Sequence, residues 1–133
     1  MDSKPFLRLA DIKAIAAASE AEALRNDWAV TITIVDDGGH PLYLQRLDNA
    51  SPGSAEIALS KARTAAVLKR PTRVLEERVN EGKTALLKMP GVLPLEGGEP
   101  ILIEGQCIGA VGVSGRPSHE DAQVARAGIE ALS

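Results

Sequence analysis

The sequence predicts an α+β fold in which helices flank an antiparallel sheet. Two segments have the alternation and turn chemistry of β-hairpins, and the segments around them have helical periodicity. Along the chain the order is helix, hairpin, two helices, hairpin, helix, which favours a layered structure whose neighbouring strands are antiparallel. Because 133 residues suit one hydrophobic core, we expect a single domain over 1–133.

The first part of the chain is expected to be a helix followed by a hairpin. Apolar residues recur at helical spacing over 11–25, with Asp11 as a plausible N-cap. The pattern then changes to period two over 28–35, which indicates a half-buried strand. The turn residues 36–39 tolerate positive φ and lead into a second strand over 41–47.

The middle of the chain reads as two helices. An alanine-rich helix is expected over 54–69, ending before Pro71. A second helix is expected over 72–87, although Gly82 interrupts its pattern. Irregular chain follows at Pro90 and Pro94.

The last part of the chain is expected to be a hairpin and a final helix. Two strands over 101–104 and 107–114 are joined by two turn residues. The helix over 118–132 begins with Ser118 and Asp121, which match the S-x-x-D form of a capping box.

Composition excludes several classes of function. The net charge is −3 and the 15 Lys and Arg residues are spread along the chain, so nucleic acid is not an expected partner. The N-terminus lacks the pattern of a signal peptide, and no stretch approaches the roughly 20 apolar residues that cross a bilayer. One cysteine allows no internal disulfide. We expect a soluble, cytoplasmic protein with no membrane partner.

Familiar site motifs are also missing from the sequence. The segment GAVGVSG is not a G-x-G-x-x-G that opens a helix, and nothing matches a P-loop. There is no H-E-x-x-H, C-x-x-C or C-x-x-C-H, so neither a protein-only metal site nor covalently attached haem is expected. Cys107 lies in a strand and reads as a small apolar filler.

Three polar residues border the second predicted strand. His40 lies in the tight turn before it, where the imidazole could face a ligand or could simply be exposed. Arg46 and Asp48 lie at the far end of the strand. The guanidinium could clamp a carboxylate, or it could pair with Asp48 and fix the loop.

Two polar residues lie on the apolar face of the alanine-rich helix. Lys61 is rarely placed on such a face unless it is paired or reaches a pocket, although it could also extend past Ile57 to solvent. Thr64, one turn later, could bind the same ligand or donate back to the carbonyl of Ser60.

Three blocks of sequence together resemble one known family. They are PILIEGQCIGAVGVSG at the second hairpin, VDDGGHPLYLQRLDNASPGS around the first, and IALSKARTAA in the alanine-rich helix. In this order they resemble the GlcG/HbpS family, which includes the C-terminal domain of PduO-type proteins. The resemblance implies a five-stranded antiparallel sheet flanked by helices, dimers that build up to octamers, and a haem or corrinoid ligand near a subunit interface.

The resemblance also implies where a ligand would bind. Transferred by position, the ligand-contacting residues are His40, Arg46, Asp48, Lys61, Thr64, Ser114 and Gly115. We expect Arg46 and Lys61 to meet haem propionates and His40 to be a possible axial ligand. The scarcity of aromatic residues, at 2%, is unusual for a haem pocket.

Three functions therefore stay open. The first is a haem- or tetrapyrrole-binding oligomer for storage, sensing or protection. The second is an enzyme that acts on a compact carboxylic acid in a catabolic pathway, with His40 or Lys61 as general acid or base in the same cleft. The third is a non-catalytic assembly module.

Overall fold

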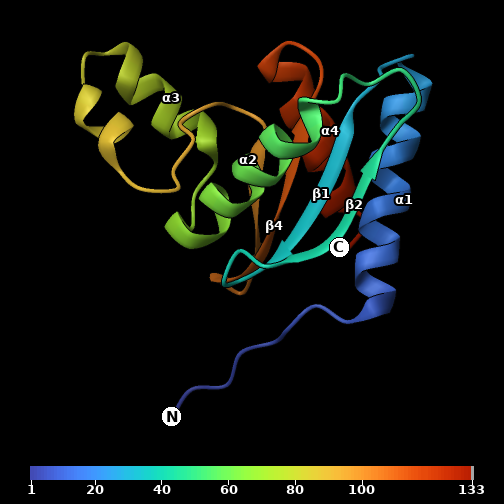
Figure 1. Ribbon diagram of the computed structural model, residues 1–133. Coiled ribbons are helices and arrows are strands. Elements are labelled where there is room, and N and C mark those ends of the chain that lie inside the picture. Colours follow the sequence, from blue (N-terminus) through green and yellow to red (C-terminus); the bar gives the residue numbers. More distant parts are fainter. Residues whose placement is uncertain (133) are drawn as a thin grey trace.

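The computed structural model describes residues 1–132 and contains a four-stranded sheet with helices on both faces (Figure 1). The strands are β1 (Thr31–Asp36), β2 (Pro41–Arg46), β3 (Gly98–Ile103) and β4 (Gln106–Ser114). Their order is β2-β1-β4-β3, and every neighbouring pair is antiparallel. Both predicted hairpins are therefore confirmed.

The expected fifth strand is wrong, because the sheet has four strands. The resemblance, and not the residue pattern, supplied that number. The chain before β3 contains Pro90 and Pro94 and forms a 3-10 helix, η1 (Thr84–Lys88), followed by irregular structure. Proline has no N–H for a ladder, so this stretch is a poor strand.

Helices cover the two faces of the sheet unequally. α1 (Leu9–Arg25) and α4 (Ser118–Glu130) pack on each other over one face, and α2 (Ser54–Leu68) packs alone on the other. In Figure 1, β1 and β2 lie in front of β4, with α2 to the left and α1 to the right. Within residues 1–132, none of these helices has the length and apolar character required to cross a bilayer.

The alternation along β1 sorts its side chains between these layers. Ile32 and Ile34 belong to the buried cluster under α1 and α4, whereas Val35 packs with Ala62 and Ala65 of α2. Thr31 also faces α2, where its hydroxyl lies 2.8 Å from that of Ser54. The period of two predicted for this strand is confirmed. The prediction that the strand is half-buried is wrong, because helices cover both faces of β1 and residues 31–35 are all buried.

The glycines of β4 allow α2 to lie directly on the sheet. A Cβ built on Gly112 would fall 2.2 Å from the carbonyl oxygen of Ala58 and 2.8 Å from the Cβ of Ala62. A residue with a side chain would therefore push the helix away from the sheet at this position. The approaching group is a helix of the same chain.

The N-terminal caps of α1 and α4 differ from the predictions. α1 begins at Leu9, so Asp11 lies inside the first turn and its carboxylate accepts the N–H of Arg8 at 2.8 Å. α4 begins at Ser118, and no side chain caps it. Asp11 as N-cap and the capping box are therefore both wrong. α1 starts before Asp11, whereas α4 starts at residue 118 as predicted but has Pro117 as its N-cap.

The second of the two middle helices is shorter than predicted. α3 (Thr72–Asn80) ends at Asn80, well before residue 87. Gly82 then adopts a φ of 101°, which a right-handed helix cannot contain. The glycine that interrupts the sequence pattern therefore ends the helix.

Candidate functional site

Three of the predicted site residues lie at the two ends of β2, the strand at one edge of the sheet. His40 precedes the strand, whereas Arg46 ends it and Asp48 follows. At a rise of roughly 3.3 Å per residue, His40 and Arg46 are about 20 Å apart. One chain therefore does not bring the imidazole and the guanidinium together.

His40 is exposed, and its ring lies beside a carboxylate. Its side chain is 79% exposed, and Nδ1 lies 3.3 Å from Oδ1 of Asp36. The same oxygen accepts the backbone N–H groups of Gly38 and His40, both at 2.9 Å. A carboxylate on one ring nitrogen orients a histidine so that the other nitrogen can bind a metal. Nε2 has no partner within residues 1–132.

The turn that carries His40 rests on the second half of α2. Nε of Arg63 donates to the carbonyl oxygen of Gly39 at 3.1 Å, and Val67 lies beside the same glycine. Val67 is 48% exposed and Leu42 is 40% exposed. We call His40, Leu42, Arg63 and Val67 the His40 surface. It combines an imidazole, two apolar side chains and a guanidinium.

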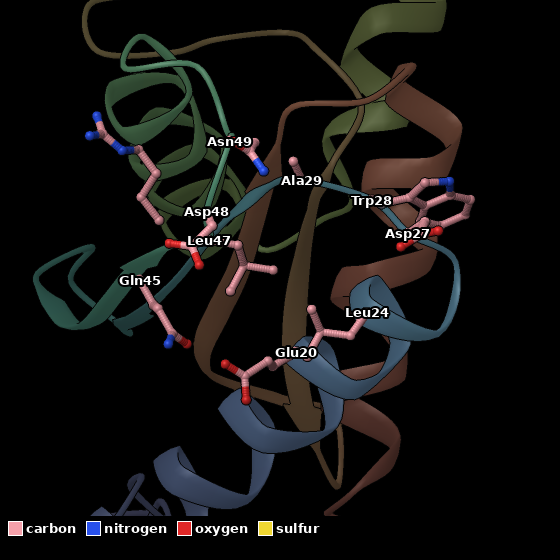
Figure 2. Close-up of a pocket in the computed structure, with 10 residues that line it drawn as sticks. Glu20, Leu24, Asp27, Trp28, Ala29, Gln45, Leu47, Asp48 and Asn49 are labelled. Atoms are coloured by element: carbon pink, nitrogen blue, oxygen red, sulfur yellow. The ribbon is translucent and has the colours of Figure 1, made fainter.

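A cavity of about 430 Å³ lies at the opposite end of β2. Figure 2 shows Glu20 and Leu24 of α1 below the chain that runs from Gln45 to Asn49. We call this the Arg46 cavity. It is lined by Glu20, Leu24, Asp27, Trp28, Ala29, Gln45, Arg46, Leu47, Asp48 and Asn49.

The Arg46 cavity has one cationic side chain among several carboxylates. Arg46 forms no side-chain hydrogen bond or ion pair with the residues that the structure describes, so the alternative in which it pairs with Asp48 is not observed. An unpaired guanidinium can hold a carboxylate by two parallel hydrogen bonds.

Ser114 and Gly115 lie behind the Arg46 cavity. Thr31 pairs with Arg46 on one side and with Ser114 on the other, so both residues are at the same end of the sheet. Ser114 is buried, and a Cβ built on Gly115 would lie 2.5 Å from the carbonyl oxygen of Ala29. Neither residue is among those that line the cavity.

Trp28, which also lines the cavity, contacts a second arginine. The guanidinium carbon of Arg116 lies 5.9 Å from the centroid of the indole ring. Such a distance is within the range of a cation–π interaction.

Lys61 is buried and fully engaged within its own chain. Only 1% of the residue is exposed, and Nζ donates to the carbonyl oxygen of Val113 and to Oδ2 of Asp121, both at 3.0 Å. Lys61 does not line the Arg46 cavity. The expected hollow shared by Arg46 and Lys61 is therefore absent from the described part of a single chain.

Sequence analysis assigned Asp121 to a capping box and missed its role as the partner of Lys61. Its Oδ1 accepts the N–H of Arg116 at 2.9 Å, which fixes the turn between β4 and α4. Burial raises the pKa of the Asp121 carboxyl, and the ammonium of Lys61 opposes that change. The only signal in the sequence was a lysine on an alanine face, because its partner is 60 residues away.

Thr64 uses its hydroxyl to hold neighbouring chain. The hydroxyl donates to the carbonyl oxygen of Ser60 at 2.7 Å and accepts the N–H of Leu93 at 2.9 Å. The back-bond to Ser60, one of the two alternatives for this residue, is observed. Thr64 is fully buried.

The two ends of β2 offer different parts of a haem site. The Arg46 cavity has no His, Cys, Met or Tyr among its lining residues, and these are the usual protein ligands of haem iron. His40 offers such a ligand at the other end. Within residues 1–132, no three His, Cys, Asp or Glu side chains are grouped to hold a metal ion.

Comparison with known proteins places this geometry in a family. The family model described as haem degrading protein HbpS-like matches residues 7–130. The chain therefore belongs to the HbpS-like family. This HbpS-like chain is 48% identical over 114 residues to the protein GlcG of Escherichia coli K12, which covers 86% of this chain and 85% of GlcG.

Solved structures of HbpS-like proteins have the same fold. The crystal structure of HbpS superposes with a TM-score of 0.91 and 35% identity, covering 100% of this chain and 94% of the other. The crystal structure of a PduOC–haem complex superposes with a TM-score of 0.87 and 28% identity, covering 96% of this chain and 95% of the other. The resemblance stated from the sequence is confirmed.

Proposed function

We propose that this HbpS-like protein binds haem or a closely related tetrapyrrole, for storage, sensing or protection. The family and the haem complex of a structural relative support this function. The observation that carries it in this chain is His40, whose Nδ1 faces Asp36 and whose Nε2 is open to solvent.

The residues of the His40 surface fit the parts of a haem. Nε2 of His40 would hold the iron, which supplies the redox and ligand-binding chemistry when it is bound. The exposed faces of Leu42 and Val67 would contact the macrocycle, and Arg63 would meet a propionate. Asp36 beside Nδ1 would favour the tautomer that carries the proton on that nitrogen and leaves the Nε2 lone pair for the iron.

We further propose that the protein is a homo-oligomer built from dimers. A ligand on the His40 surface of one chain would remain open to water on its other side, because His40 is 79% exposed. A neighbouring copy would close the site and supply the cations that one His40 surface lacks.

The Arg46 cavity supports a second candidate, an enzyme that acts on a compact carboxylic acid. A volume of about 430 Å³ is in the range of small-molecule sites, and Arg46 is an unpaired carboxylate clamp. His40 is too distant and Lys61 too engaged to act here as acid or base. That role would fall to Glu20 or Asp48, which line the cavity.

Haemin titration tests the first proposal. The sequence contains two histidines, so His119→Ala is a matched control for His40→Ala. We expect a saturable Soret shift with wild type and with His119→Ala, and at least tenfold weaker binding with His40→Ala. Equal affinity of all three proteins would show that His40 does not hold the iron.

Calorimetric titration with small hydroxy and oxo acids tests the second candidate function, an enzyme that acts on a compact carboxylic acid. We expect binding that Arg46→Gln abolishes and that His40→Ala leaves unchanged. Any acid that binds Arg46→Gln as tightly as wild type rules out the guanidinium clamp.

A further inference from the structure

The Arg46 cavity has apolar side chains among its charged ones. Leu24 of α1 lines the cavity although 62% of the residue is exposed, and Leu47 lines it from the chain that follows β2. Trp28 adds an indole ring that is partly buried against the core. Single exposed leucines are ordinary on a protein surface, but three large apolar side chains in one hollow offer contact to a ligand. The cavity therefore suits a molecule that has an apolar part.

The charged side chains that line the cavity have no partner within the protein. They are Glu20, Asp27, Arg46 and Asp48. Within residues 1–132, none of the four forms a side-chain hydrogen bond or an ion pair. Glu22, which lies on the same helix but does not line the cavity, is instead engaged by Arg25 and Gln123. The charges around the cavity are therefore available to a ligand.

The balance of these charges disfavours a ligand that is only an acid. One guanidinium and three carboxylates give the lining a formal charge of −2. A plain carboxylic acid would add a further negative charge, and the repulsion between like charges opposes its binding. A ligand that also has an ammonium group offsets the excess of carboxylates. The cavity is thus better matched to a zwitterion.

One side of the cavity combines acceptors for an ammonium group with donors for a carboxylate. Figure 2 shows Glu20, Gln45 and Asp48 on this side. The two carboxylates can accept hydrogen bonds from an ammonium group. The amide oxygen of Gln45 accepts the hydroxyl of Tyr43, so the N–H groups of the amide remain free to donate. The guanidinium of Arg46 supplies further donors next to it in the chain.

We propose that the Arg46 cavity binds a compact α-amino acid that has an apolar side chain. Arg46 and Gln45 hold its carboxylate, whereas Glu20 and Asp48 hold its ammonium group. Leu24 contacts its side chain. An α-amino acid has both charged groups on one carbon, which matches donors and acceptors that lie side by side in residues 45–48. The inference rests on the small-acid function proposed above for this cavity and names its substrate class, and it is independent of haem binding.

A matched series of ligands tests the two charged groups separately. Free leucine, isocaproic acid and isoamylamine share one apolar body, and they have both groups, only the carboxylate and only the ammonium group. We expect free leucine to bind at least about tenfold more tightly than the other two. Free phenylalanine, hydrocinnamic acid and phenethylamine repeat the comparison with an aromatic body. Calorimetry measures the affinities, and the emission of Trp28, the single tryptophan, reports on occupancy of the cavity.

Single substitutions assign the two groups to side chains. Glu20→Gln and Asp48→Asn should each weaken the binding of free leucine about tenfold, and neither should weaken that of isocaproic acid, because each removes a like charge. Arg46→Gln should weaken both acids and leave isoamylamine unchanged. Glu56→Gln is the matched control, because Glu56 is an exposed carboxylate of α2 that does not line the cavity. Circular dichroism shows whether each variant is folded.

The outcomes separate this inference from the functions proposed above. Isocaproic acid that binds as tightly as free leucine, and loses affinity in Arg46→Gln, overturns the ammonium site and leaves the small-acid function. Isoamylamine that binds as tightly as free leucine overturns the guanidinium clamp, and with it both the amino-acid site and the small-acid function. No binding of either series at about 10 mM overturns both for this cavity and leaves haem binding. Unchanged affinity for free leucine in Glu20→Gln and Asp48→Asn overturns the proposed ammonium contacts.

Discussion

Lys61 and Arg46 are both cations near the same end of the sheet, yet they have opposite surroundings. Lys61 is enclosed between α2, β4 and α4 and has two oxygen partners at 3.0 Å. Arg46 is exposed on the β2 edge and has no partner among residues 1–132. The difference teaches that a lysine on the apolar face of a helix is not by itself evidence of a ligand-binding residue. A group that already uses its hydrogen bonds for folding has little left for a ligand.

Removing the Lys61 ammonium should have the largest effect on stability. Lys61→Met leaves the carboxylate of Asp121 buried without a cation, which typically costs about 3–5 kcal/mol. Arg46→Met, the matched change on the open edge, should stay within about 0.5 kcal/mol. Urea denaturation measures both free energies of unfolding. Similar losses in the two variants would contradict the contrast between the buried and the open cation.

A double variant sharpens the same prediction. Asp121→Asn removes the unpaired charge, so Lys61→Met/Asp121→Asn should be more stable than Lys61→Met alone. Additive losses would mean that the two side chains act independently.

The close contact of α2 with β4 should give the next largest effect. Gly112→Ala places a methyl group 2.2 Å from the carbonyl oxygen of Ala58, and we expect a loss of about 1–3 kcal/mol. Gly53→Ala is the control, because a Cβ there meets no atom within 4 Å. Thermal unfolding of both variants measures the difference. A Gly112→Ala protein as stable as Gly53→Ala would show that the helix can move away from the sheet.

Glu99 should give the smallest effect, visible in the pH dependence of stability. Burial raises the pKa of the Glu99 carboxyl above 4.5, although Arg126 at 3.1 Å and Arg73 oppose this and Glu96 adds to it. The folded state then holds its proton more tightly than the unfolded state. The stability from this group is therefore full below pH 4.5 and is lost as pH rises through the raised pKa.

Comparison with Glu99→Gln isolates that contribution from the other carboxyls. The free energy of unfolding of wild type minus that of Glu99→Gln should fall with increasing pH above 4.5 and then become constant. Denaturant titrations at several pH values measure it. A difference that rises with pH would mean that the ion pair with Arg126 outweighs burial.

Much of the fold followed from local patterns, because hairpins and helices depend on residues close together in the chain. The alternation within 28–35 predicted β1, which runs over Thr31–Asp36, and the turn residues predicted both hairpins. Gly82 lies just after the end of α3. The number of strands was wrong, since the family resemblance supplied it.

The candidate site was less predictable because it depends on contacts between distant residues. The partner of Lys61 is Asp121, and no local pattern connects α2 with the start of α4. The Asp36–His40 contact lies within one turn, yet sequence analysis weighed His40 alone. The separation of His40 from Arg46 follows from the length of the strand between them, and that length was predictable from the sequence.

Trp28, whose ring lies against Arg116, is a fluorescent reporter within the protein itself. Trp28 is the single tryptophan, so all intrinsic indole emission comes from the rim of one cavity. Haem absorbs strongly where indoles emit, and its arrival at either end of β2 would quench this signal by energy transfer. Ligand occupancy could thus be followed in real time in unlabelled protein.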